Sequence, residues 1–278
     1  MIEAYLKHEE ERNAQGIPAL PLNPEQTAEL CKLLENPPKG REEFLVNLLK
    51  ERVSPGVDPA AEVKAAFLAE IIKGTKKSPL VSRVDAVRIL GTMIGGYNVG
   101  PLVDALTDAE LADEAACALS GLTLVYDGFD RVVELSKTNA AAMKVLKSWA
   151  DAEWFTKRPG VPETITVKVF KVEGEINTDD FSPAGDAWSR PDIPLHALAM
   201  GKTRFPNRLK DIAAWRAAGH QVAFVGDVVG TGSSRKSACN SVLWHMGQEI
   251  PAVPNKKTAG VIIGGVIAPI FFNTAQDS

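Results

Sequence analysis

Apolar residues recur every three or four positions through roughly the first 155 residues, the spacing of amphipathic helices. Asn23-Pro24 and Asp58-Pro59 each set a capping side chain before proline, so both predict the start of a helix. Asn36-Pro37-Pro38 and Gly74 predict two of the helix ends. We expect further helices over 82–93, 101–106, 108–119 and 130–154, joined by short turns.

Serial helices of about 10–15 residues predict stacked helical hairpins, an α-solenoid of the HEAT or armadillo kind. No fixed period is visible, so a compact irregular helical bundle is the alternative. A solenoid exposes long faces that suit partner binding. The helical part contains one histidine, His8, and no constellation typical of catalysis.

The pattern changes after Arg158-Pro159-Gly160-Val161-Pro162, which predicts a linker. Residues 164–170 alternate between polar and apolar and are rich in β-branched side chains, which predicts a strand. Further elements are expected as a helix over 207–218, a buried strand over 221–226, a helix over 234–246 and a buried strand over 260–264. This alternation predicts a three-layer or barrel-like α/β domain. The expected organisation is a helical domain over 1–157 and an α/β domain over 158–278.

The composition is that of an ordinary globular protein: 278 residues, 45% apolar, 24% charged, net charge −4. No run of about 18 apolar residues exists, so we expect no membrane span. Cys31, Cys117 and Cys239 lie far apart without a CxxC pair, which favours a reducing cytoplasm and disfavours a metal or cluster site built from this chain alone. The chain also lacks the basic stripe that phosphate-dominated nucleic-acid binding needs.

Residues 268–278 predict the start of a further helix, in which Phe271 and Phe272 need packing partners. We therefore expect an α/β domain that is incomplete at its C-terminus, and a chain that is a fragment of a longer protein.

The most informative segment for chemistry is Gly226–Ser237, GDVVGTGSSRKS, between a predicted strand and a predicted helix. Glycines let several backbone N–H groups converge, and the start of a helix adds partial positive charge. We expect Ser233 and Ser234 at the N-cap and Arg235 reaching the same space, which suits a carboxylate or phosphate. An ordinary turn with serine caps is the alternative. P-loop, dinucleotide and serine-elbow motifs all fail here.

A second polar segment, NTDDFSPAG, runs from Asn177 to Gly185 and leads to Trp188-Ser189-Arg190. It carries a pair of carboxylates and an arginine. A surface loop with Asx and serine turns is the alternative reading of this composition.

Together the two segments resemble the swivel domain of the aconitase superfamily. The longer stretches DAWSRPDIPLHALAM, VGDVVGTGSSRKSACNSVLW and IPAVPNKK resemble the aconitase B family. So do NPPKGREEFLVNLLKERVSPGVDPAAEVKAAFL and SWADAEWF in the helical part, and the resemblance thus covers essentially the whole chain. In that family a HEAT-like domain and then the swivel domain precede the cluster-bearing domains.

The resemblance implies a citric-acid-cycle hydro-lyase that interconverts citrate and isocitrate through cis-aconitate and also acts on 2-methylisocitrate. A [4Fe-4S] cluster with an open iron serves as the Lewis acid in that family. By resemblance, Ser233 is the base for the Cα proton, Asp179 is the active-site aspartate, and Arg190, Ser233, Ser234 and Arg235 bind substrate. Helix-start N–H groups and Arg235 are the groups available to stabilise a serine alkoxide.

No cysteine triplet for the cluster is present, so we expect this polypeptide to be inactive alone. The alternative function is a protein–protein interaction module that forms a homodimer through the helical domain and contacts other citric-acid-cycle enzymes. RNA binding by the cluster-free form is a weaker possibility that the family suggests. The expected location is the cytoplasm, without membrane contact.

Overall fold

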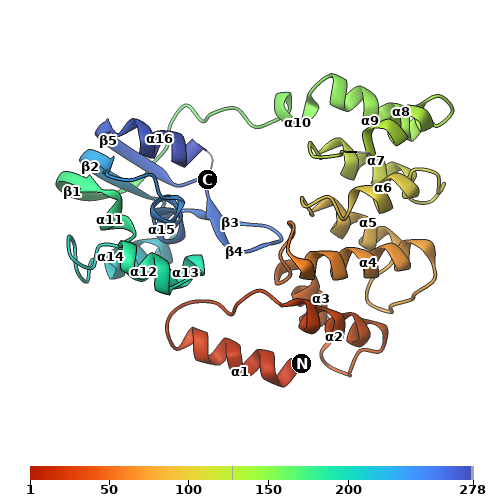
Figure 1. Cartoon of the computed structure of the whole chain (residues 1–278), viewed down its shortest axis with the longest axis horizontal. Helices are drawn as coiled ribbons and strands as arrows, with labels where there is room; N and C mark the ends of the chain where they lie inside the picture. Colours follow the sequence, from red (N-terminus) through yellow and green to blue (C-terminus); the bar gives the residue numbers. More distant parts are fainter. Residues whose placement is uncertain (127, 277–278) are drawn as a thin grey trace. The chain divides into compact units, whose positions relative to one another are not determined.

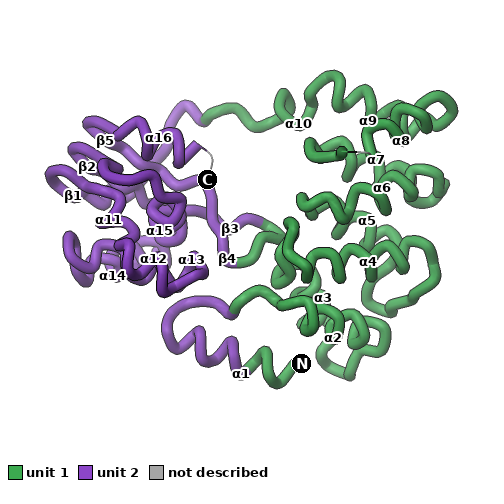
Figure 2. The backbone as a smooth tube through the Cα atoms, viewed as in Figure 1, with its two compact units in different colours: residues 1–6, 20–161, 251–254 green, residues 7–19, 162–250, 255–278 purple. Residues whose placement is uncertain are grey.

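The computed structural model describes residues 1–126 and 128–276 of the chain. The backbone divides into two compact units, coloured green and purple in Figure 2. Unit 1 comprises Met1–Leu6, Leu20–Val161 and Pro251–Pro254, and unit 2 comprises Lys7–Ala19, Pro162–Ile250 and the chain from Asn255 onward. In the sequence, the longest stretch of unit 1 ends at Val161 and that of unit 2 begins at Pro162, within the proline- and glycine-rich segment.

Unit 1 is helical, and its helices pack mainly on near neighbours in the sequence (Figure 1). They are α2 (Pro24–Glu35), α3 (Glu42–Glu51), α4 (Pro59–Lys73), α5 (Arg83–Gly91), α6 (Val99–Ala105), α7 (Ala112–Ser120), α8 (Gly128–Ser136), α9 (Ala140–Ala150) and α10 (Glu153–Thr156). Helix α1 (Ile2–Asn13) begins in unit 1 and ends in unit 2. Among the described residues, no helix has the length and apolar character needed to cross a bilayer.

Both helix starts that were predicted from capping signals are confirmed. The Asn23 side chain accepts from the Gln26 amide at 2.8 Å, and Pro24 is the first residue of α2. Asp58 caps α4 by accepting from the Ala60 amide at 2.8 Å. The expected single helix over 130–154 is wrong. It is split into α8, α9 and α10, because Asn139 caps a new helix by accepting from the Ala142 amide.

The core of unit 1 contains a buried lysine. Lys64 of α4 is 0% exposed, and its Nζ has no hydrogen-bond partner among the described residues. Burial disfavours the ammonium form and lowers the pKa of Lys64 to about 8, while nearby Glu51 opposes that shift. Buried leucines occupy the same core, among them Leu30, Leu34, Leu45, Leu48, Leu49 and Leu68.

Unit 2 is built on a parallel sheet with the strand order β1-β2-β5. The strands are β1 (Lys168–Asn177), β2 (Val222–Thr231) and β5 (Val261–Ile267). A separate pair, β3 (Gln248–Ile250) and β4 (Val253–Thr258), was not predicted. The helices are α11 (Thr178–Phe181), α12 (Ala184–Ser189), α13 (Ile193–Ala197), α14 (Leu209–Ala217), α15 (Lys236–Met246) and α16 (Pro269–Gln276). The strand expected over 164–170 begins only at Lys168, where pairing with Val222 starts.

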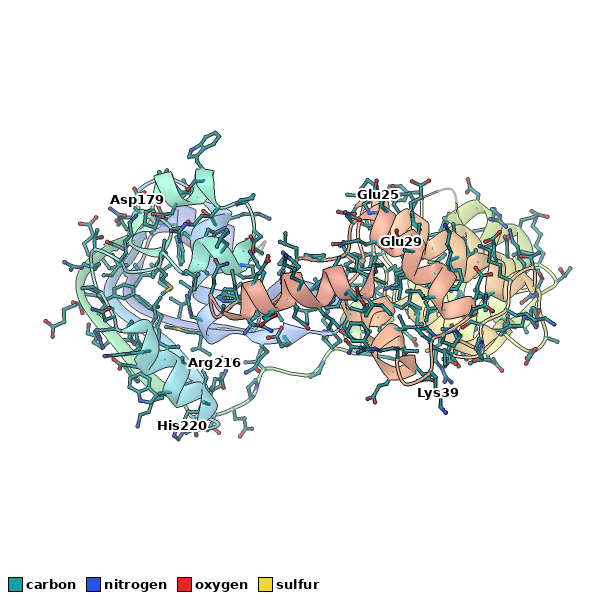
Figure 3. All side chains as sticks on the ribbon, turned by 90° about the horizontal axis from the view of Figure 1, so that it is seen from below. Glu25, Glu29, Lys39, Asp179, Arg216 and His220 are labelled. Atoms are coloured by element: carbon teal, nitrogen blue, oxygen red, sulfur yellow. The ribbon has the colours of Figure 1, made fainter. Side chains whose placement is uncertain are left out.

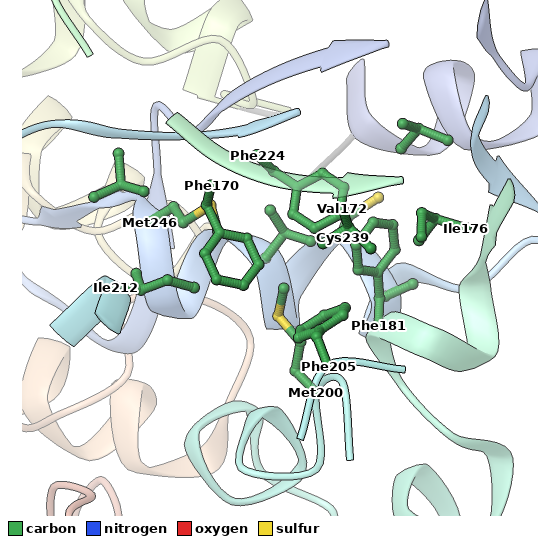
Figure 4. Close-up of a cluster of buried hydrophobic side chains, with 14 of the residues drawn as sticks. Phe170, Val172, Ile176, Phe181, Met200, Phe205, Ile212, Phe224, Cys239 and Met246 are labelled. Carbon is green, nitrogen blue, oxygen red and sulfur yellow. The ribbon is translucent and has the colours of Figure 1, made fainter. Parts of the chain in front are cut away.

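Aromatic side chains form the core of unit 2 (Figure 4). Phe181 lies edge-on to Phe224 with ring centroids 4.9 Å apart, and it stacks on Phe271 at 5.5 Å. Phe271 thus has the packing partner that the sequence required, whereas Phe272 remains 50% exposed. Cys239 is 2% exposed and packs in this cluster.

We predict that Lys64→Met stabilises the chain most below pH 8. The folded state then no longer holds a buried ammonium group, and a pKa of about 8 against 10.5 corresponds to about 3 kcal/mol. Between pH 8 and 10.5 the unfolded state binds more protons than the folded state, so the wild type gains stability and the advantage of the variant shrinks. Urea unfolding at pH 7 and pH 10 measures this change, with exposed Lys73→Met on the same helix as the control. Equal differences at both pH values would contradict it.

Candidate functional site

The carboxyl ends of β1 and β2 lie side by side. Asn177, the last residue of β1, pairs with Thr231, the last residue of β2, after a register shift that skips Gly230. In parallel sheets the segments that follow neighbouring strands therefore emerge at one edge, which is where α/β folds bind ligands. The first polar segment singled out in the sequence begins at this edge, at Asn177. The second, Gly226–Ser237, begins inside β2 and leaves the sheet at this edge after Thr231.

Asn177 fixes the backbone of the first segment. Its Oδ1 accepts from the amides of Asp179 at 2.6 Å and Asp180 at 3.3 Å, while Oδ2 of Asp180 accepts from the Asn177 amide at 2.9 Å. This reciprocal capping box starts the short helix α11. Asp179 lies at the surface of unit 2 (Figure 3), with its side chain 52% exposed.

Two glycines with positive φ angles shape the second segment. Gly230 has φ +82°, and a Cβ there would lie 2.2 Å from Cγ of Phe271. Gly232 has φ +92° and lies against Thr178, whose buried hydroxyl donates to the carbonyl of Ser233 at 2.9 Å. Thr178 therefore ties the Ser233 loop to the start of α11. The sequence analysis assigned Thr178 no role, although this residue lies in the NTDDFSPAG segment.

Arg235 and Asp179 form an ion pair between the two segments, from Nη1 to Oδ1. Nη1 of Arg235 also donates to the carbonyl of Ser182 at 3.2 Å, and Oδ1 of Asp179 also accepts from the Ala184 amide at 3.1 Å. The guanidinium holds the pKa of Asp179 below its usual value, and the Ala184 amide adds to the effect. Asp179 is thus ionised at neutral pH.

The expected serine cap on α15 is wrong. The N-cap residue is Arg235, whose backbone is extended and whose side chain makes no capping hydrogen bond, because a guanidinium has no acceptor; it binds Asp179 instead. Ser233 is exposed, and its hydroxyl lies in the loop before the helix. The Ser234 hydroxyl lies 2.9 Å from Oγ1 of Thr274 in α16.

Arg190 follows α12 and is held more loosely. Its Nη2 lies 3.4 Å from Oδ1 of Asp186, and its Nη1 donates to the carbonyl of Leu195 at 3.4 Å. The side chain is 37% exposed, so the guanidinium can also reach a ligand.

An open hollow of about 400 Å³ adjoins these residues. Its lining residues are Ala184, Ala187, Trp188, Pro191, Arg235 and Ser237. Trp188 and Pro191 flank Arg190 in the sequence, so the segments that carry Arg190 and Arg235 border the same hollow. Trp188, which is 89% exposed, had no assigned role in the sequence. A cationic group beside apolar walls suits a small organic anion.

The described residues do not fit an iron–sulfur cluster. No group of three histidine, cysteine or acidic side chains in the described ranges could hold a metal ion. Cys31 is buried in unit 1, where burial raises the pKa of its thiol to about 12, and Cys239 is packed in unit 2. Cys117 is exposed on α7.

Comparison with known families gives two matches. A model described as the aconitate B N-terminal domain matches residues 4–155, and a model described as the aconitate hydratase 2 N-terminus matches residues 167–278. Similar proteins called aconitate hydratase B occur in Synechocystis sp. (58% identical over 280 residues), Escherichia coli K12 (58% over 289) and Helicobacter pylori J99 (52% over 279). Each match covers 100% of this chain and 32–33% of the relative, so the chain spans about a third of their length. Because the first family model alone covers more than half of the chain and the relatives match it throughout, the chain belongs to the aconitate hydratase B family.

Proposed function

We propose that this chain is the N-terminal part of an aconitate hydratase, a hydro-lyase that interconverts citrate and isocitrate through cis-aconitate. Residues 1–157 serve as a HEAT-like helical domain and residues 158–278 as the swivel domain of a cytoplasmic enzyme. The observation that carries the proposal is that the segments bearing Asp179, Ser233 and Arg235 meet at the carboxyl edge of a parallel sheet. They are joined there by the Arg235–Asp179 ion pair and by the hydrogen bond from Thr178 to the Ser233 carbonyl.

The arginines supply the charge that a tricarboxylate needs. Both described hydrogen bonds of Arg235 use Nη1, which leaves Nη2 and Nε to donate to a substrate carboxylate. Arg190, from the neighbouring segment, binds a second carboxylate. The two guanidinium groups orient the substrate, and the apolar wall formed by Trp188 and Pro191 faces its hydrocarbon part.

Ser233 acts as the base. Its alkoxide takes the proton from the carbon next to a substrate carboxylate. The electron pair of the broken C–H bond forms the double bond of cis-aconitate as the C–O bond on the adjacent carbon breaks, and the hydroxyl leaves as water with a proton from a donor outside this chain. The alkoxide is stabilised by the positive start of α15 and by Arg235, two residues away. Ser234, adjacent to this base, contributes a second substrate contact.

The described residues do not bind a cluster, so no step assigned to this chain depends on one. We propose that the [4Fe-4S] group implied by the family resemblance is held outside the third of the relatives that this chain covers. The isolated chain is accordingly expected to be inactive. Action on 2-methylisocitrate follows the same carboxylate-binding chemistry.

Turnover in a chimera tests the role of Ser233. The chain replaces the matching third of the Escherichia coli relative, and citrate-to-isocitrate conversion is followed. Ser233→Ala is expected to lower kcat about 100-fold or more, because loss of a general base typically costs that much. The control is Ser189→Ala, which removes an exposed hydroxyl bonded to the Gly185 carbonyl. Normal turnover by Ser233→Ala would refute the assignment of the base.

Titration calorimetry of the 278-residue chain with tricarballylate, an unreactive tricarboxylate, tests Arg235. Arg235→Lys keeps the charge but loses the planar fork, so the Kd is expected to rise about tenfold. The matched control is Arg204→Lys, because the hydrogen bond of the Arg204 side chain within the described part of the chain goes to the Glu173 carbonyl. An unchanged Kd for Arg235→Lys would count against carboxylate binding at this position.

A second function, homodimer formation through the helical domain, is favoured by aromatic side chains near its end. Phe129 stacks on Trp149 with centroids 6.0 Å apart, and Phe155 is 60% exposed. Exposed aromatics of this kind are enriched at protein interfaces. The same helices could contact other citric-acid-cycle enzymes. RNA binding by the cluster-free form ranks below these, because the chain carries a net charge of −4.

Sedimentation of the full chain tests this surface. Phe155→Ser removes an exposed aromatic anchor and is expected to raise the dimer dissociation constant about tenfold. Ile94→Ser, which changes another exposed apolar side chain (61%), serves as the control. A wild-type chain that stays monomeric at high concentration would contradict self-association.

A further inference from the structure

A buried arginine from the start of the chain belongs to unit 2. Arg12, near the end of α1, lies in the segment Lys7–Ala19 of that unit and is 7% exposed. Its Nη2 and Nη1 bind the two carboxylate oxygens of Asp192 at 2.6 and 3.2 Å. Its Nε donates to the carbonyl of Pro18 at 2.9 Å. All three nitrogens of the guanidinium are thus engaged, which fixes its plane.

Asp192 in turn fixes the first turn of α13. Its Oδ1, the oxygen that receives Nη2 of Arg12, also accepts from the Leu195 amide at 3.2 Å. Its backbone carbonyl accepts from the His196 amide at 3.1 Å. Burial lowers the pKa of His196, so that side chain is neutral at pH 7 and Arg12 is the cation bound to Asp192.

The same turn contacts the candidate substrate-binding arginine, Arg190. The carbonyl of Leu195 accepts from Nη1 of Arg190 at 3.4 Å. Leu195 is therefore bound through its amide to Asp192 and through its carbonyl to Arg190. A continuous path of hydrogen bonds runs from Arg12 through Asp192 and Leu195 to the guanidinium of Arg190.

We propose that Arg12 is a positioning residue for Arg190, acting through Asp192 and the first turn of α13. This inference rests on the proposed function, in which Arg190 binds a substrate carboxylate. The pair is well suited to the role because its side chains are only 8% and 16% exposed. A buried charge that loses its partner must turn toward water, and that movement would carry the turn with it.

The chemistry requires arginine at position 12. A lysine ammonium could replace one of the two bonds to Asp192, but not both bonds together with the one to Pro18. Arg12→Lys should accordingly show a partial effect and Arg12→Gln a full one. The matched control is Arg131→Gln, which breaks the exposed pair of Arg131 and Asp104 in unit 1.

The experiment uses the 278-residue chain labelled with ¹⁵N-arginine, at temperatures where circular dichroism shows each variant to be folded. One readout is the Nε–H NMR signal of Arg190, assigned from its loss in Arg190→Lys. The other is the Kd for tricarballylate. We expect Arg12→Gln to shift or broaden the Arg190 signal and to raise the Kd on the order of tenfold, below the roughly 100-fold that a 1 Å misplacement can cost. Arg131→Gln should change neither readout.

The outcomes separate the two claims. If Arg12→Gln lowers only the melting temperature and leaves the Arg190 signal and the Kd unchanged, Arg12 has a purely structural role and the inference is overturned. If Arg12→Gln fails to fold, Arg12→Lys and Asp192→Asn decide by the same two readouts. If the wild type binds no tricarballylate, the proposed function is contradicted, and the Arg190 signal alone decides whether Arg12 positions it.

Discussion

The candidate site depends on a single constraint: two parallel strands end at the same level of one sheet. Pairing of Asn177 with Thr231 brings the two following segments together, and the hydrogen bond from Thr178 to the Ser233 carbonyl holds them there. Phe181 anchors the first segment by packing on Phe224 and Phe271 in the core. The sheet register and the packing of Phe271 against Gly230 hold the second segment.

The ion pair of Arg235 and Asp179 contributes orientation more than stability. The Asp179 side chain is half exposed, and pairs of this kind add little to the free energy of unfolding in water. The Arg235–Asp179 pair holds one edge of the guanidinium in place and leaves the other edge available to a ligand. The Arg12–Asp192 pair is different, because both of its side chains are largely buried and its loss leaves an unpaired charge.

Local signals in the sequence predicted local structure well. The caps formed by Asn23 and Asp58 were predictable because each is a hydrogen bond between a side chain and the backbone amide two or three residues later. The predicted serine cap is wrong: Arg235 is the N-cap residue of α15, and its side chain binds Asp179, 56 residues away in the sequence. The roles of Thr178 and Arg12 could not be read from the sequence, since their partners lie 55 and 180 residues away. The motifs identified the segments of the site, and the strand register determines how they meet.

The most direct test of the account is an NMR titration of the ¹⁵N-labelled chain with citrate, followed through backbone amide shifts. Saturable shifts confined to the residues after β1 and after β2, including Asp179, Ser233 and Arg235, would support a shared carboxylate site at the sheet edge. Shifts in only one of the two segments, or saturable shifts elsewhere with this edge unchanged, would contradict it.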